Sequence, residues 1–263
     1  MTGPLRKLPD FLIIGAQKGG TSSLFHFIEQ HPAVRVSIAK EIHYFDLNYR
    51  KGDYWYRGYF PYAWDRRITG EASPFYLFHP QVPARVRQDV PGAKIIILLR
   101  DPVERAFSHY RMNVKDGIET LSFEEALAAE ELRIGGDVDQ MEADARYTGR
   151  DYRHYSYIAR GFYDDQLSRW LQYFPRDQML LLKSEDLFAN PAPIVQQAFT
   201  FLGMDPDAHI GYDGKNEGKP GNIRPETRAR LRLTFAPHNA NLMAILGPNF
   251  RWDDDPLRTS AAG

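Results

Sequence analysis

The sequence predicts an α/β protein of three layers, in which helices flank a central, mostly parallel β-sheet. Residues 94–99 (KIIILL) and 179–183 (MLLLK) are continuous apolar runs of strand length, as expected for parallel strands that are covered on both faces. Segments with helical patterns separate such runs along the chain, and this alternation is typical of a parallel sheet. A chain of 263 residues is also long enough to bury a large core.

The composition narrows the classes of protein to consider. We predict one domain, 1–263, and two small domains are the alternative. The 33 basic and 34 acidic residues nearly balance, so the overall charge gives no reason to expect nucleic acid or a membrane surface as a partner. The lack of cysteine excludes disulfides, thiolate metal sites and a cysteine nucleophile. With no signal-peptide pattern and no apolar run that could span a membrane, we expect a cytoplasmic protein without a transmembrane segment.

The elements follow from local patterns and from the residues that end them. Two polar stretches break the alternation: residues 134–154 are predicted to form a long surface loop or lid, and residues 253–263 a loose tail. The patterns predict strands at 11–14, 33–37, 94–99 and 179–183, and a short strand that runs into a turn within 68–74. They predict helices from 21 onwards and at 79–90, 103–116, 122–133, 192–202 and 225–246.

The stretch 11–24 (FLIIGAQKGGTSSL) predicts a buried strand, a glycine-rich turn and a helix. Gly19 and Gly20 allow the backbone to approach a ligand closely, and the hydroxyls of residues 21–23 can cap the helix. Free N–H groups at a helix start, together with Lys18, form an anion site, although such turns also occur for packing alone. In a Walker A loop the lysine follows the last glycine, whereas Lys18 precedes them, which disfavours an ordinary kinase.

The residue that ends the strand 94–99 indicates a second anion. A Walker B strand ends in a carboxylate that holds magnesium, but this strand ends in Arg100, whose planar guanidinium suits phosphate oxygens. Ser108 lies about two helical turns further on, within reach of the same anion. A structural ion pair of Arg100 with Asp101 or Glu104 is the alternative. With a second anchor at Lys18, the pattern predicts a nucleotide that is phosphorylated at both the 3′ and the 5′ position.

Residues 40–46 (KEIHYFD) alternate ionisable and apolar residues, as a solvated edge strand also would. Together with GAQKGGTS at 15–22, LRDPVERAFSHY at 99–110 and the segment 161–175, this stretch resembles the sulfotransferases that use 3′-phosphoadenosine 5′-phosphosulfate (PAPS). The similarity is greatest to the heparan sulfate 3-O- and N-sulfotransferases and their bacterial relatives, and it covers nearly the whole chain. It implies a P-loop-like fold and the transfer of a sulfuryl group from PAPS to a hydroxyl, with adenosine 3′,5′-bisphosphate (PAP) as product and no metal.

The resemblance also implies roles for individual positions. Glu41 matches the family's general base for in-line transfer, His43 lies beside it, and Lys18 would stabilise the leaving phosphate. Residues expected to contact the acceptor are Asp46, Ser73 and Tyr163. Residues expected to bind the cofactor are Lys18, Gly19, Gly20, Thr21, Ser22, Arg100, Ser108, Lys219, Gly221 and Asn222.

The sequence departs from the heparan-type members at one position. They carry a lysine in an E-K-[ST]-P motif, and this chain has Ala72 in its place. We therefore expect the hydroxyl of a different small-molecule, glycan or lipid acceptor, such as a bacterial glycan, a glycolipid or a secondary metabolite. Two other functions are considered: a P-loop-type kinase or phosphotransferase, which would need ATP and magnesium, and a non-catalytic nucleotide-binding relative.

Overall fold

The computed structural model of this chain describes residues 5–144, 147–212, 222–247 and 250–252. The chain forms two compact units. The first unit contains residues 1–99 and 169–217, and the second contains residues 100–168 and 218–263. Each unit is built from two separate stretches of chain, and the prediction of one domain stays a prediction.

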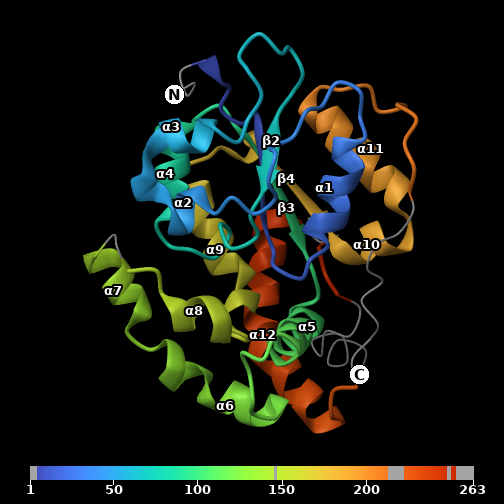
Figure 1. Cartoon of the computed structure of the whole chain (residues 1–263). Helices are drawn as coiled ribbons and strands as arrows, with labels where there is room; N and C mark the ends of the chain where they lie inside the picture. Colours follow the sequence, from blue (N-terminus) through green and yellow to red (C-terminus); the bar gives the residue numbers. More distant parts are fainter. Residues whose placement is uncertain (1–4, 145–146, 213–221, 248–249, 253–263) are drawn as a thin grey trace. The chain divides into compact units, whose positions relative to one another are not determined.

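The first unit contains a parallel four-stranded sheet (Figure 1). Its strands are β1 (Phe11–Gly15), β2 (Gly70–Ala72), β3 (Lys94–Leu99) and β4 (Met179–Lys183), in the order β2-β1-β3-β4. All three pairings are parallel, so the carboxyl ends of the strands lie at one edge, where ligands bind in such sheets. The predicted α/β class is confirmed, and β3 and β4 lie at the residues that their apolar runs predict.

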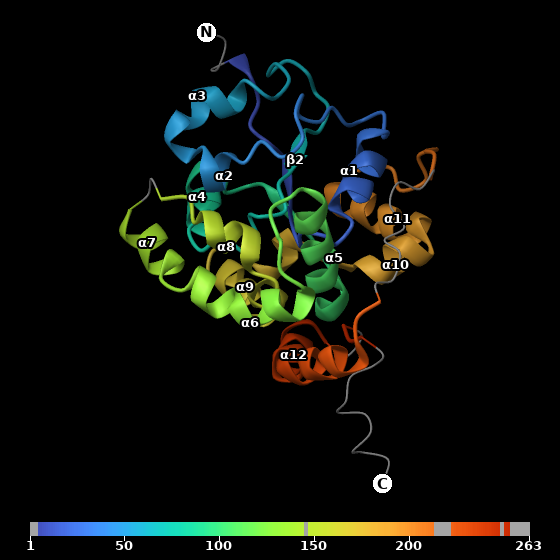
Figure 2. The ribbon, with the colours of Figure 1, turned by 60° about the horizontal axis from the view of Figure 1, so that its bottom comes forward.

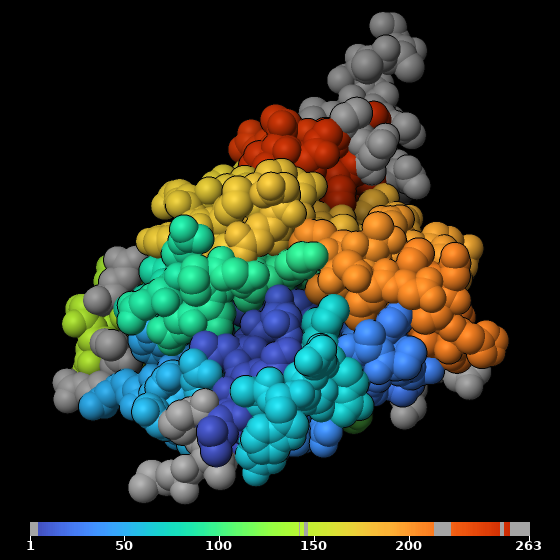
Figure 3. All heavy atoms as spheres, turned by 90° about the horizontal axis from the view of Figure 1, so that it is seen from above, coloured from blue at the N-terminus to red at the C-terminus, as the bar shows by residue number. Residues whose placement is uncertain are grey.

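Three helices cover one face of this sheet: α1 (Thr21–Glu29), α10 (Ser184–Ala189) and α11 (Pro191–Leu202). Their apolar side chains pack against residues of the strands in one buried cluster. In the space-filling view the orange atoms of the α11 region lie beside the blue atoms of the α1 region (Figure 3). On the other side of the sheet lie α2 (Tyr44–Leu47), α3 (Gly52–Arg57) and α4 (Val82–Asp89).

The segment 33–41 runs beside β2 without forming the predicted strand. Val34 makes a single parallel bridge with Ile68. Further along, the N–H of Ser37 donates to the carbonyl of Gly70 over 3.1 Å, and that of Glu41 to the carbonyl of Ala72 over 3.1 Å. Steps of three and four residues on one side therefore face steps of two on the other, and this spacing prevents a regular ladder.

The second unit is helical and contains α5 (Pro102–Lys115), α6 (Phe123–Ile134), α7 (Asp137–Ala143), α8 (Arg150–Tyr155) and α12 (Pro225–Leu246). The helix α9 (Tyr163–Leu171) begins in the segment of the second unit and ends in that of the first. In Figure 2, α6 and α8 lie side by side. Short 3-10 turns occupy Tyr49–Lys51, Ala159–Gly161 and Arg176–Gln178.

The prediction that residues 134–154 form a long loop is wrong, because this segment contains α7 and α8. Gly136 and Gly149 precede the two helices with φ values of 82° and 55°, a conformation that favours glycine. Asp137 is buried and connects the segment, accepting hydrogen bonds from the hydroxyl of Tyr147 (2.6 Å) and the N–H of Tyr152 (2.8 Å). The segment is largely polar, so its composition does not reveal this order, and the buried carboxylate of Asp137 holds it together.

Within the described part of the chain, no helix is both long and apolar enough to cross a membrane. The tail 253–263 lies outside the described residues, as do Lys219 and Gly221, which are predicted to bind the cofactor.

Candidate active site

The glycine-rich turn after β1 is held against the ends of β3 and β4. The N–H of Ala16 donates to the carbonyl of Leu98 over 2.6 Å, and the hydroxyl of Ser184 donates to the carbonyl of Gly19 over 2.6 Å. A Cβ atom at Gly19 would lie 2.8 Å from the Leu98 oxygen and 2.9 Å from the oxygen of Ala16. Position 19 therefore requires glycine, because any side chain would collide with the backbone of β3 and of the loop itself.

The helix α1 begins directly after this turn without a side-chain cap. Its N-cap is Gly20, with φ 89°, and no side chain caps the first turn, so the prediction that hydroxyls of residues 21–23 cap the helix is wrong. A helix start without a side-chain cap leaves N–H groups available to an anion. Ser22 is exposed at this end and Lys18 is half-buried just before it. These features fit the phosphate end of a nucleotide, as the sequence predicts.

The three residues that the sequence predicts to be catalytic, Lys18, Glu41 and His43, also have an unusual backbone conformation. Among the described residues, the non-glycine residues with positive φ are Lys18 (71°), Glu41 (58°) and His43 (53°). The left-handed region costs free energy for residues with a Cβ. Such conformations persist where the surroundings impose them, and they cluster at functional sites.

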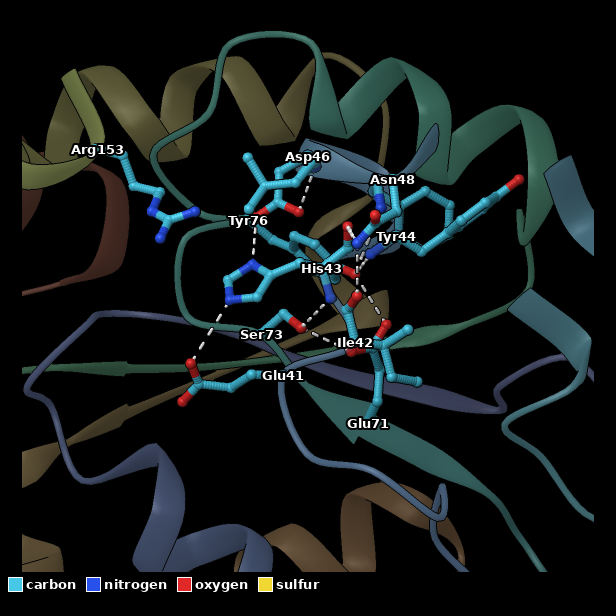
Figure 4. Close-up of polar contacts among 12 residues, drawn as sticks. Glu41, Ile42, His43, Tyr44, Asp46, Asn48, Glu71, Ser73, Tyr76 and Arg153 are labelled. Atoms are coloured by element: carbon cyan, nitrogen blue, oxygen red, sulfur yellow. Dashed lines mark hydrogen bonds and ion pairs between the residues drawn. The ribbon is translucent and has the colours of Figure 1, made fainter. Parts of the chain in front are cut away.

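The side chains of Glu41, His43 and Asp46 form a chain of contacts (Figure 4). The Nδ1 atom of His43 lies 2.7 Å from the carboxylate of Asp46, and its Nε2 atom lies 3.5 Å from Oε2 of Glu41. The Asp46 side chain is fully buried, whereas that of Glu41 is 43% exposed. The predicted contact of Asp46 with an acceptor is not favoured by this geometry. Asp46 orients His43, and Glu41 is the member of the chain that solvent reaches.

The surroundings of His43 and Glu41 shift the pKa values of the two groups in opposite directions. Burial opposes the charged form of His43, but the contacts with Asp46 and Glu41 outweigh it and raise the pKa of His43 to about 9. The hydrogen bond from His43, opposed by burial and assisted by Lys40, lowers the pKa of Glu41. At neutral pH, His43 is therefore an imidazolium that cannot accept a proton, and Glu41 is a carboxylate that can.

Lys40 joins this group to the start of α1, directly after the glycine-rich turn. Its ammonium donates a hydrogen bond to the hydroxyl of Ser22 and lies 3.4 Å from Oε1 of Glu41. Because Ser22 is the second residue of α1, this contact brings the start of the helix next to the carboxylate. The sequence identifies the loop 15–22 and the stretch 40–46 separately, and it gives no signal that Lys40 connects them.

A buried network holds the segment that carries Glu41 and His43. The fully buried carboxylate of Glu71 accepts hydrogen bonds from the hydroxyls of Tyr56 (2.7 Å), Tyr76 (2.9 Å) and Ser73 (2.7 Å). Burial raises the pKa of Glu71. The Ser73 hydroxyl in turn accepts the N–H of His43 over 3.2 Å (Figure 4). Ser73 is fully buried, so the geometry favours a supporting role over the predicted contact with an acceptor.

The second predicted anion site belongs to the second unit. Arg100 directly follows β3 and is half-buried, as is Ser108 on α5. The carboxylates considered as structural partners of Arg100 have other contacts, since Asp101 lies 2.7 Å from Arg232 and Glu104 lies 2.5 Å from Arg228.

Two further predicted residues also lie in the second unit. Tyr163 is buried and its hydroxyl donates to the carbonyl of Arg100 over 2.9 Å. It thereby supports the backbone at Arg100, and this geometry does not favour the predicted contact with an acceptor. Asn222 is exposed.

Within the described ranges, one group of side chains is close enough to hold a metal ion: Asp164, Asp165 and His238. Both oxygens of Asp164 already accept hydrogen bonds, one in a 2.8 Å contact with Nδ1 of His238 and one from Asn241 at 2.9 Å. These contacts favour a structural role in linking α9 to α12.

Comparison with known proteins decides the family. The sequence profile of the sulfotransferase domain matches residues 8–212. The chain belongs to the sulfotransferase family. It is 32% identical to mouse heparan sulfate glucosamine 3-O-sulfotransferase 6 over 94% of its own length and 75% of that protein. It is also 32% identical to the human 3-O-sulfotransferase 3B1, covering 66% of that protein.

Solved structures of sulfotransferases share the fold. A sulfotransferase from Alicyclobacillus acidocaldarius is 32% identical and superposes with a TM-score of 0.73, covering 91% of this chain and 96% of that one. The mouse sulfotransferase SULT7A1, solved in complex with PAP, has a TM-score of 0.57 at 14% identity and supports the fold alone. The predicted P-loop-like arrangement of this sulfotransferase is confirmed, and its family is one of enzymes.

Proposed function

We propose that this sulfotransferase moves a sulfuryl group from PAPS to a hydroxyl group, with Glu41 as general base. The observation that supports this most is the contact of Lys40 with both Ser22 and Glu41, because it joins an anion-binding helix start to an ionised carboxylate. Family membership and the PAP complex of SULT7A1 support PAPS as the donor.

The residues present fit the phosphosulfate end of this donor. The uncapped start of α1 offers N–H groups, Gly19 leaves room where a Cβ would collide, and Lys18 adds a positive charge. When bound, PAPS would supply the activated sulfuryl group. Lys18 and the N–H groups would stabilise the negative charge that develops on the leaving phosphate oxygen, and Arg100 with Ser108 is proposed to hold the 3′-phosphate.

The proton of the acceptor hydroxyl would pass to Glu41. Its carboxylate is ionised at neutral pH, and the imidazolium of His43 holds one of its oxygens at 3.5 Å. In the proposed in-line transfer, the acceptor oxygen would form a bond to sulfur while the bond from sulfur to the phosphate oxygen would break, and the electron pair of that bond would leave on the phosphate. Asp46 keeps His43 protonated and oriented.

A carbohydrate hydroxyl is the acceptor class that we propose. The relatives named above are heparan sulfate glucosamine 3-O-sulfotransferases, which supports a glycan. Ala72 at the position of the heparan-type lysine leads us to test neutral glycans and glycolipids beside heparan sulfate. A cytoplasmic location stays a prediction.

The experiment combines transfer with binding. Labelled PAPS is offered with heparan sulfate, neutral glycans, glycolipids and a phenol, and product is identified by mass. Glu41→Gln should lower kcat by about 10²–10⁴-fold, the usual contribution of a general base, with PAP affinity within about twofold. Glu29→Gln, at the far end of α1, is the matched control.

Two results would contradict the proposal. Tight binding of ATP with magnesium and none of PAP would favour a phosphotransferase. An unchanged kcat in Glu41→Gln would remove Glu41 as the base while leaving the donor assignment intact.

A further inference from the structure

Lys40 occupies a position that the proposed roles of its neighbours do not explain. Its ammonium contacts the Ser22 hydroxyl at the start of α1 and lies 3.4 Å from Oε1 of Glu41. Only 34% of its side chain is exposed, so it is directed along the protein surface toward these groups. A surface ion pair by itself contributes little to stability, about 0–1 kcal/mol, so stability alone gives little reason for this arrangement.

Lys40 lies between the start of α1 and the carboxylate of Glu41. If the loop 15–22 holds the phosphosulfate and Glu41 receives the acceptor proton, the sulfur atom must lie between the two during transfer. A lysine ammonium has three protons to donate, and the contacts with Ser22 and Glu41 use two of them. The third proton can then bind a non-bridging oxygen of the sulfuryl group.

We propose that Lys40 is a catalytic residue that binds the sulfuryl group itself, in addition to the lysine of the glycine-rich loop. This inference rests on the proposed function. Lys40 stays protonated throughout, the acceptor proton goes to Glu41, and the electron pair of the broken sulfur–oxygen bond leaves on the phosphate. Lys18 acts on the leaving phosphate, whereas Lys40 acts on the oxygens that remain on sulfur.

A second consequence concerns Glu41. With PAPS bound, Lys40 would keep its contact with Oε1 of Glu41 but share its positive charge with the sulfuryl oxygens, and this would weaken its hold on the carboxylate. Lys40 helps to lower the pKa of Glu41, so donor binding makes the carboxylate a stronger base at the moment when the acceptor must lose its proton.

The test compares a donor that has the sulfuryl group with one that lacks it. Calorimetry measures binding of PAPS and of PAP to the wild type, Lys40→Met and Lys40→Arg, and kcat is measured with the best acceptor. Lys40→Met should weaken PAPS binding by about tenfold, PAP binding by no more than about twofold, and kcat by about 100-fold, the size typical of removing one charge-stabilising donor. Lys40→Arg keeps the charge and should recover part of each loss.

Lys51→Met is the matched control, because it removes the same charge eleven residues further on, where the ammonium lies 4.3 Å from the ring centre of Trp55 instead. Its kcat and both affinities should equal those of the wild type. Thermal melting of each variant shows whether it is folded.

The outcomes separate this inference from the proposed function. If Lys40→Met weakens PAPS and PAP binding equally, or leaves kcat within about twofold, Lys40 is not a sulfuryl ligand although the enzyme still transfers sulfate. If the wild type binds neither PAP nor PAPS and transfers nothing, the function itself is wrong.

Discussion

Replacing Asp46 by asparagine tests whether the buried carboxylate sets the charge of His43. The contact between His43 Nδ1 and Asp46 Oδ2 is 2.7 Å, and the Asp46 side chain is fully buried. The pKa of His43 is raised from 6.5 to about 9. Because a tenfold change in proton affinity is worth about 1.4 kcal/mol, this rise corresponds to about 3 kcal/mol in favour of the imidazolium.

The sign of the effect on stability follows from the same two values. The folded state binds the proton of His43 more tightly than the unfolded state does, so the stabilisation is complete below pH 6.5 and is lost as the pH rises to about 9. In Asp46→Asn the negative charge is gone and burial opposes the imidazolium, so the pKa of His43 should fall toward or below 6.5. The variant should therefore lose less stability than the wild type over this pH range.

Two measurements check this prediction. NMR titration of the imidazole C–H signals gives the pKa of His43, and urea unfolding at several pH values gives the stability. Asp53→Asn, which removes an exposed carboxylate paired with Arg57 at 3.2 Å, is the control and should leave the His43 titration unchanged. A wild-type His43 that titrates at its ordinary value of 6.5, or an Asp46→Asn variant that keeps the high value, would refute the reasoning.

Two other predictions concern packing. Gly19→Ala places a Cβ 2.8 and 2.9 Å from backbone oxygens, so it should lower the free energy of unfolding by about 1–3 kcal/mol and weaken PAP binding. Gly92→Ala is the control, because its Cβ meets nothing within 4 Å, and it should change neither quantity. Equal melting temperatures and PAP affinities of the two variants would contradict this prediction. Tyr76→Phe removes a buried hydroxyl that donates to Glu71 over 2.9 Å and should cost about 1–3 kcal/mol in urea unfolding. Tyr54→Phe, on a side chain that is 62% exposed, is its control, and a loss no larger than this control's would count against the network.

The fold was largely predictable, because its main elements have strong local signals. The apolar runs 94–99 and 179–183 form β3 and β4 at those residues, and α12 spans 225–246 as its pattern predicts. The failures occur where tertiary contacts replace a local signal. The segment 134–154 contains the helices α7 and α8, which the buried and hydrogen-bonded Asp137 connects. Residues 33–37 lack a strand because their spacing does not match β2.

The site residues were recognisable by type, but their arrangement was not. The alternation at 40–46 is equally compatible with an edge strand, whereas the structure has a turn with positive φ at Glu41 and His43. No local propensity favours that conformation for a glutamate or a histidine. The residues that impose it, Ser73, Tyr76 and Glu71, are distant in sequence, and no local pattern indicates that they contact this segment.

The network around Glu71 explains how the segment keeps this unfavourable conformation. The N–H groups of His43 and Tyr44 are bound by the hydroxyls of Ser73 (3.2 Å) and Tyr76 (2.8 Å), and both hydroxyls donate to the one buried carboxylate. Each hydroxyl can donate only one proton, so its direction toward Glu71 leaves its lone pairs facing the backbone of the segment. Glu71 thus determines in which direction each of these hydroxyls donates its hydrogen bond. The fully buried carboxylate of Glu71 thereby holds the backbone of His43 and Tyr44 in place.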